Sequence, residues 1–281
     1  MRVVPQRQRQ LSVSNLAWPA DKDDEALDLV AGLGFDGVEL APGKVFGNLN
    51  LVSLDDVRAY RRQVEDRGLM IPALQGILFG VQGAHLFESS ASRERMIAHL
   101  YRVAEVAEAL NAKVCVFGAP SLRDPGALSA PEALNVAIEF LRTIAPEYAS
   151  RGVELCFEAN PPLYQCRFVT ETEEAFELVE QVNAPGVAMQ LDTGTIFINA
   201  EDPAVIGRVQ HRIGHVHVSE PNLLPIGTGG VDHGPLADEV RNSTYSGWIS
   251  IEMKLTGDWR SALREAYNLV GTLYCETKGA A

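Results

Sequence analysis

Short apolar and β-branched runs recur along the chain, and segments whose apolar positions repeat with a helical period lie between them. The runs predict eight strands, at residues 11–18, 37–42, 71–80, 112–119, 153–160, 186–194, 213–220 and 248–254. Helical periodicity predicts helices within residues 21–34, 89–111, 130–152, 170–182 and 258–274. The helical pattern is weakest after the sixth and seventh strands. Strand–helix alternation of this kind is typical of an α/β protein built as a closed parallel (β/α)8 TIM barrel.

The later predicted strands alternate apolar and polar residues. In the seventh strand, Val216 and Val218 share one face, and His215 and His217 share the other. In a barrel one strand face packs on the helices and the other points into the interior, so we assign the apolar face to the helix layer. The polar faces then lie inside the barrel, where polar groups are costly to bury without a purpose.

Four polar residues end these interior rows, each on a different one of the last four strands. They are Glu158, Asp192, His217 and Glu252. The carboxyl ends of barrel strands form the mouth where barrel enzymes carry out their chemistry. Taken singly, each residue fits a rim salt bridge or a satisfied core histidine. Together, three carboxylates and one imidazole predict a site for one divalent ion: Mn²⁺, Mg²⁺, Co²⁺ or Zn²⁺. His215 lies one layer deeper, where it can orient a ligand.

Length and charge restrict the class of protein. The 281 residues suit a single (β/α)8 domain spanning 1–281, with residues 1–10 predicted as a flexible N-terminal extension. The formal charge of −13 disfavours binding to nucleic acid and to anionic membranes. Four scattered cysteines, the lack of a signal-peptide pattern and apolar runs well short of about 20 residues together predict a cytoplasmic protein.

The motifs CFEANP, MQLDTG, GHVHVSEPN and ISIEM occur in this order near the ends of the last four predicted strands. Their order and spacing resemble the xylose-isomerase-like TIM barrel superfamily. The closer resemblance is to the sugar phosphate isomerase/epimerase group, which includes ketose 3-epimerases, hydroxypyruvate isomerase and inosose dehydratase. It extends from about Leu11 to the last helix. It implies that Glu158, Asp192, His217 and Glu252 bind one divalent metal ion, and that Glu158 and Glu252 also form the acid/base pair.

The chain departs from that group at two positions. Thr195 stands where ketose epimerases have a substrate-contacting histidine, and Leu223 stands where they usually have an arginine. The resemblance therefore implies the metal site but not the substrate. The glycine-rich loop at 220–234 fits either a phosphate or hydroxyl cradle or an ordinary mobile turn. Further candidates for contact with the substrate are Asn160, Lys254, His215, Glu39 and Arg123. Glu39 fits a substrate-side acid and a salt bridge at the mouth equally well.

The sequence therefore predicts a metal-dependent isomerase or epimerase acting on a sugar, sugar phosphate or cyclitol through an enediolate. A lyase similar to inosose dehydratase, using the same metal and enolate, is the main alternative. A hydrolase similar to endonuclease IV is disfavoured. Its trinuclear zinc site needs many histidine and acidic ligands, and this chain has only six histidines. A non-catalytic sugar-binding barrel is the remaining alternative. Related barrels often form homodimers or homotetramers, which gives the expected oligomeric state.

Overall fold

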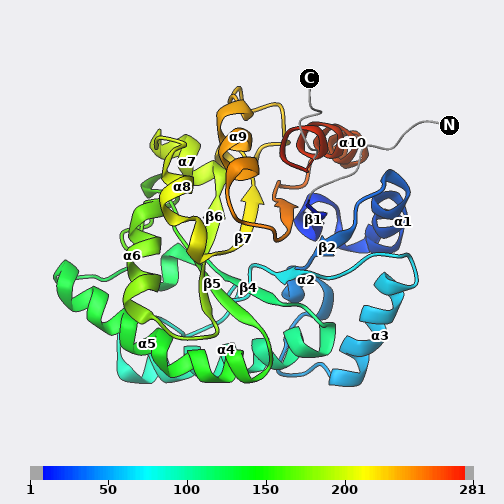
Figure 1. Ribbon diagram of the computed structural model, residues 1–281. Helices are drawn as coiled ribbons and strands as arrows, with labels where there is room; N and C mark the ends of the chain where they lie inside the picture. Colours follow the sequence, from blue (N-terminus) through cyan, green and yellow to red (C-terminus); the bar gives the residue numbers. More distant parts are fainter. Residues whose placement is uncertain (1–8, 276–281) are drawn as a thin grey trace.

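Eight parallel strands curl into a nearly closed barrel in the computed structural model, which describes residues 9–275 (Figure 1). The strands are β1 (Leu11–Ser14), β2 (Gly37–Glu39), β3 (Ala73–Leu74), β4 (Val114–Phe117), β5 (Glu154–Glu158), β6 (Val187–Asp192), β7 (Ile213–Val218) and β8 (Ile249–Ile251). Their order in the sheet is β2-β1-β8-β7-β6-β5-β4-β3. Backbone hydrogen bonds from Val38 to Met70 and from Leu40 to Ala73, of 2.9 and 3.1 Å, join the two edges. The predicted (β/α)8 barrel is confirmed.

The helices surround the strands (Figure 1). They are α1 (Asp23–Leu33), α2 (Pro42–Phe46), α3 (Leu54–Glu65), α4 (Ser90–Leu110), α5 (Ala130–Ser150), α6 (Thr172–Val182), α7 (Thr193–Asn199), α8 (Val205–Val209), α9 (Gly234–Asn242) and α10 (Trp259–Val270). Short 3₁₀ turns lie at 15–17, 20–22, 120–122, 162–164, 210–212 and 221–223, and a π turn at 271–275. The five predicted helices are present, and the short α7, α8 and α9 follow the strands after which the helical pattern is weakest.

Helices α2 and α3 were not predicted, and the strands are shorter than predicted, most clearly the first and the third. The Ser53 side chain caps α3 by accepting from the Asp56 N–H. The first strand stops at Ser14, whose hydroxyl accepts from the Leu16 N–H and starts a 3₁₀ turn. The third strand was predicted over 71–80 but covers only Ala73–Leu74. Gly76 and Gly80 have φ of +58° and +77°, a conformation that no strand uses, so the rest of this run is a loop over the barrel mouth.

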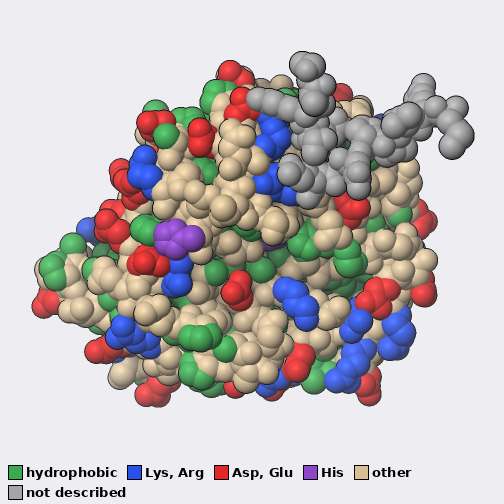
Figure 2. All heavy atoms as spheres, viewed as in Figure 1, with side chains coloured by type: hydrophobic (Ala, Val, Ile, Leu, Met, Phe, Trp, Pro, Cys, Tyr) green, Lys and Arg blue, Asp and Glu red, His purple; other side chains and the backbone are tan. Residues whose placement is uncertain are grey.

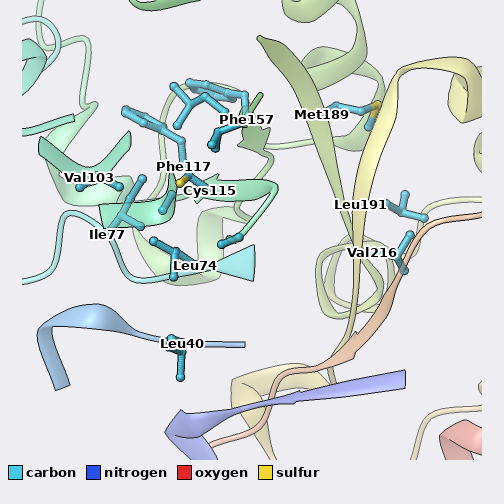
Figure 3. Close-up of a cluster of buried hydrophobic side chains, with 14 of the residues drawn as sticks. Leu40, Leu74, Ile77, Val103, Cys115, Phe117, Phe157, Met189, Leu191 and Val216 are labelled. Carbon is cyan, nitrogen blue, oxygen red and sulfur yellow. The ribbon is translucent and has the colours of Figure 1, made fainter. Parts of the chain in front are cut away.

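The alternation predicted for the strands is present in the core. Phe157 points into the layer between sheet and helices, where its ring stacks on Phe117 with centroids 5.1 Å apart (Figure 3). Cys156, the next residue back along the strand, belongs instead to a small apolar cluster inside the barrel with Val116 and Ala188. Because β5 continues with the same period, Glu158 points inward above this cluster. The interior row of β5 thus changes from apolar at Cys156 to acidic at Glu158, at the mouth.

The start of the chain is anchored just before β1. Of the flexible extension predicted for 1–10, residues 1–8 lie outside the described part. Arg9 is 5% exposed and donates to the backbone oxygens of Val240 and Tyr245, at 2.9 and 2.8 Å. The assignment of 1–281 to a single domain stays a prediction. Within residues 9–275, no helix combines the length and the apolar character that a bilayer crossing requires.

Candidate metal centre

Three of the four predicted metal ligands meet at the barrel mouth. Glu158 ends β5, His217 lies near the end of β7, and Glu252 directly follows β8. The His217 Nδ1 atom is 3.6 Å from Glu158 Oε1 and 3.5 Å from Glu252 Oε2. One ligand atom from each of the three residues lies within 4.8 Å of the others. Two carboxylates and an imidazole at this spacing can hold a divalent ion.

Asp192, the fourth predicted ligand, lies at the same level of the barrel as His217, but both of its carboxylate oxygens accept hydrogen bonds from the protein. It ends β6 and pairs in register with His217. Its Oδ1 accepts from the Gly194 N–H at 3.1 Å and from the Ser219 hydroxyl. Its Oδ2 accepts from the Thr195 N–H and hydroxyl at 3.2 and 3.0 Å. A carboxylate has about four lone-pair sites, so in this arrangement Asp192 caps α7 with its full capacity.

Thr195 and Ser219 therefore belong to the surroundings of Asp192. Thr195, at the position where ketose epimerases have histidine, is 1% exposed and its hydroxyl also lies 3.1 Å from the Ala159 oxygen. Sequence reasoning did not single out Ser219. A signal for it existed, because Ser219 is two residues beyond His217 and therefore lies on the same strand face.

A buried carboxylate orients His217 from below. Glu39 is 0% exposed, and its oxygens lie 3.0 Å from His217 Nε2 and 3.2 Å from His215 Nε2. Burial alone would raise the pKa of Glu39, but the two imidazoles outweigh it and hold that pKa well below its usual range. A carboxylate on Nε2 favours a proton there, so a neutral His217 ring would offer its Nδ1 lone pair to an ion held with Glu158 and Glu252. Glu39 and His215 thus lie beneath the site.

The acidic groups of the mouth disfavour one another's charge. Burial raises the pKa of Glu252 to about 7, with Glu158 and Asp192 adding to the effect of burial. Burial and the nearby Glu158 likewise raise the pKa of Asp192. Burial would lower the pKa of His217, but Glu39 and Glu252 raise it well above its usual value. Such a group of buried acids is stabilised by a positive charge among them, and the chemistry of the donors fits a divalent cation.

Glu158 is held from behind by a hydrogen-bonded chain. Its Oε2 accepts from Asn160 Nδ2 at 2.8 Å, and Asn160 Oδ1 accepts from Arg123 Nη2 at 2.9 Å. The Arg123 guanidinium is 0% exposed and lies 4.7 Å above the centroid of the Phe157 ring. Arg123, predicted as a substrate contact, therefore reaches the site only through Asn160. Lys254, another predicted contact, is exposed beyond Glu252.

A cavity of about 510 Å³ opens over these residues. Glu158, Asn160, His217 and Glu252 line one side of it, and residues 75–82 of the β3–α4 loop line the other. Tyr164, from the turn after β5, also faces the cavity. The loop was missed from the sequence because its apolar residues were assigned to the third strand. Its glycines were the available signal.

Backbone N–H groups of the glycine-rich loop after β7 are hydrogen-bonded within the loop. Glu220 is 0% exposed and accepts from the backbone N–H groups of Gly227 and Gly229. His233 lies 3.1 Å from the same carboxylate through Nε2 and 2.9 Å from the Tyr274 hydroxyl through Nδ1. These amides are therefore committed to an internal acid, and the phosphate-cradle interpretation is wrong for Gly227 and Gly229.

The sequence and the fold identify the family. Residues 27–270 match the model of the xylose isomerase-like TIM barrel family, and the chain belongs to it. The D-psicose 3-epimerase of Enterocloster bolteae is 28% identical to this chain over 90 residues. That match spans 32% of this chain and 30% of the epimerase, so it covers less than a third of either protein.

Solved structures with the same fold cover nearly the whole chain. A D-psicose 3-epimerase crystallised in the presence of D-fructose matches with a TM-score of 0.80 at 19% identity, over 94% of this chain and 99% of that one. An L-ribulose 3-epimerase matches with a TM-score of 0.80 at 17% identity, over 94% of each chain. The 3-keto-D-glucoside 4-epimerase of E. coli matches with a TM-score of 0.78 at 18% identity, over 94% and 99%. At these identities the likeness is one of fold.

Proposed function

We propose that this protein is a divalent-metal-dependent enzyme that isomerises or epimerises a carbohydrate. The observation that carries the proposal is the meeting of Glu158, His217 and Glu252, within 4.8 Å of one another, at the mouth of the barrel. Membership of the xylose isomerase-like family supports it, as do the titles of the matched structures, which are those of sugar epimerases.

In this proposal Glu158, His217 and Glu252 hold the ion. Asp192 becomes the fourth ligand when its hydrogen bond from Ser219 is released, since that bond occupies one of its oxygens. Oxygen and imidazole donors accept Mn²⁺, Mg²⁺, Co²⁺ and Zn²⁺ alike, so the donor set leaves the metal open. When bound, the ion supplies Lewis acidity toward a substrate carbonyl and its adjacent hydroxyl.

The two glutamates carry the proton transfer. Glu158 Oε1 and Glu252 Oε2 lie 3.6 and 3.5 Å from His217 Nδ1 and come from the ends of different strands, so we assign each to a different side of the substrate. One removes the proton beside the carbonyl and the other returns a proton. The hydrogen bond from Asn160 fixes the orientation of Glu158 while it acts.

Exchange of substrate hydrogen with solvent tests this proposal. We expect the metal-loaded protein, incubated in D₂O with a panel of ketoses and their derivatives, to incorporate deuterium at the carbon beside the carbonyl of its substrate. Glu158→Gln should abolish incorporation. Glu154→Gln is the matched control, because Glu154 starts the same strand and is exposed at its opposite end.

Three outcomes are informative. Exchange at wild-type rate in Glu158→Gln would contradict the assignment of the base. A product lighter by one water would indicate the lyase alternative, which uses the same residues. Absence of exchange with every compound in a protein that binds metal would favour the non-catalytic sugar-binding barrel. The expectation of a homodimer or homotetramer in the cytoplasm stays a prediction.

A further inference from the structure

The cavity wall opposite the carboxylates is apolar. Within the described residues, the apolar side chains of this wall include Leu16, Ile77, Phe79, Val81 and Leu122. Ile77 is buried, whereas the Phe79 side chain is 92% exposed. A large aromatic ring left in solvent beside an apolar cavity has a surface to contribute to a ligand.

Three of the polar side chains that line the cavity are engaged within the protein. The Gln75 amide donates to the Ser14 hydroxyl, and the Gln82 amide donates to the Gly80 oxygen at 3.3 Å. Asn160 uses both ends of its amide, on Arg123 and on Glu158. The hydroxyls of a free sugar that lay against the apolar side chains of this wall would lose water without gaining hydrogen bonds from them, which is unfavourable. Partners for hydroxyls are concentrated on the carboxylate side.

Away from the proposed metal site, the described residues that line the cavity offer no lysine or arginine to a charged substrate. Lys44 donates to the backbone oxygens of Asn15 and Trp18 instead. Arg123 is fully buried behind Asn160. A phosphate that lay along residues 75–82 would therefore have no lysine or arginine as a counter-ion among the described residues of the cavity, which disfavours its binding there.

We propose that the substrate is an uncharged carbohydrate that bears both a carbonyl group, which the function proposed above requires, and an apolar substituent, as in an alkyl or aryl glycoside with one ring hydroxyl oxidised to a ketone. Its hydroxyl-bearing end lies at Glu158 and Glu252, and its substituent lies against residues 75–82 with Phe79 as the main contact. The assignment of the reacting end rests on the function proposed above. A second cavity of about 490 Å³ shares residues 76–77 and 79–82 with the first and is lined further by Asn48, Leu49, Asn50 and His99. A substituent can therefore extend along the loop.

Calorimetric titration of the Mn²⁺-loaded protein with three matched compounds tests this proposal. The compounds are D-glucose, D-glucose 6-phosphate and phenyl β-D-glucoside. We expect the phenyl glucoside to bind about tenfold or more tightly than glucose, through stacking and burial of its ring. The phosphate should bind no more tightly than glucose. Phe79→Ala should remove most of the preference for the phenyl compound. Leu51→Ala is the control, because Leu51 is 84% exposed but does not line the cavity.

The proposal is overturned if the phosphate binds more tightly than glucose, if the phenyl glucoside shows no advantage or no binding, or if Phe79→Ala keeps the full preference. Both variants change exposed side chains, so folding is preserved. Repeating the titrations without metal separates the two proposals. A preference for the phenyl compound in a protein that fails to bind Mn²⁺ would uphold the substrate class and contradict the metal-dependent function.

Discussion

Replacing Glu39 by glutamine tests how the metal centre is oriented. The Glu39 carboxylate accepts from two imidazoles, at 3.0 Å from His217 Nε2 and 3.2 Å from His215 Nε2. A glutamine of the same shape has one acceptor and one donor end. One of the two histidines must then accept at Nε2 and carry its proton on Nδ1. If that histidine is His217, the proton occupies the position that faces the metal.

Glu39→Gln is expected to lower both the affinity for metal and the stability of the metal-free protein. Mutation of a carboxylate that orients a metal-binding histidine typically weakens metal affinity by about 10–100-fold. This equals about 1.4–2.8 kcal/mol, since each factor of ten in affinity is about 1.4 kcal/mol. Stability without metal should fall by about 1–3 kcal/mol, because buried imidazoles lose a charged hydrogen-bond partner. Titration calorimetry with Mn²⁺ or Zn²⁺ measures the first quantity, and urea unfolding of the metal-free protein measures the second.

Glu154→Gln controls for the loss of one negative charge, because Glu154 is exposed at the far end of the barrel. Its metal affinity should match that of the wild type. A folded Glu39→Gln protein that binds metal as tightly as the wild type would refute the orienting role of Glu39.

Three further results are expected. Ser219→Ala should free one oxygen of Asp192 and raise metal affinity several-fold in calorimetry; an unchanged or lower affinity would argue against Asp192 as the fourth ligand. Arg123→Met should lower kcat about tenfold with KM little changed, because Asn160 loses the donor that positions it; a rise in KM alone would indicate a different role. Burial lowers the pKa of His233, so the unfolded chain takes up its proton first as pH falls. The contribution of neutral His233 to stability is therefore present above the unfolded pKa of about 6.5 and is lost as pH falls through the folded pKa. Urea unfolding between pH 7 and pH 5 should show a smaller loss of stability in His233→Gln than in the wild type, and equal slopes would contradict this.

The placement of Glu158, His217 and Glu252 was predictable from the sequence for a simple reason. Period-two alternation fixes which face of a strand a residue occupies, and parallel barrel strands bring their carboxyl ends to one mouth. Residues at the ends of interior rows on different strands must therefore converge. The comparison with the family model confirms the fold to which this reasoning applies.

Other features of the site cannot be predicted from the alternation of apolar and polar residues in the sequence. Whether Asp192 is free to bind metal depends on hydroxyl groups of Thr195 and Ser219, whose rotamers no sequence pattern specifies. In the glycine-rich loop, Glu220 accepts a hydrogen bond from the backbone N–H of Gly227. The sequence of the loop does not show whether such N–H groups are bonded internally or are open to a ligand. The apolar run at 71–80 has the composition of a strand. The positive φ of its glycines is what makes most of it a loop that lines the cavity.

Metal stoichiometry tests the central claim most directly. The purified protein, incubated with Mn²⁺, Co²⁺ or Zn²⁺ and freed of excess ion, would be analysed for metal content beside His217→Ala and Glu154→Gln. The account predicts about one ion per chain in the wild type and in Glu154→Gln, and its loss in His217→Ala. No bound ion in the wild type with any of the three metals, or full retention in His217→Ala, would contradict the account.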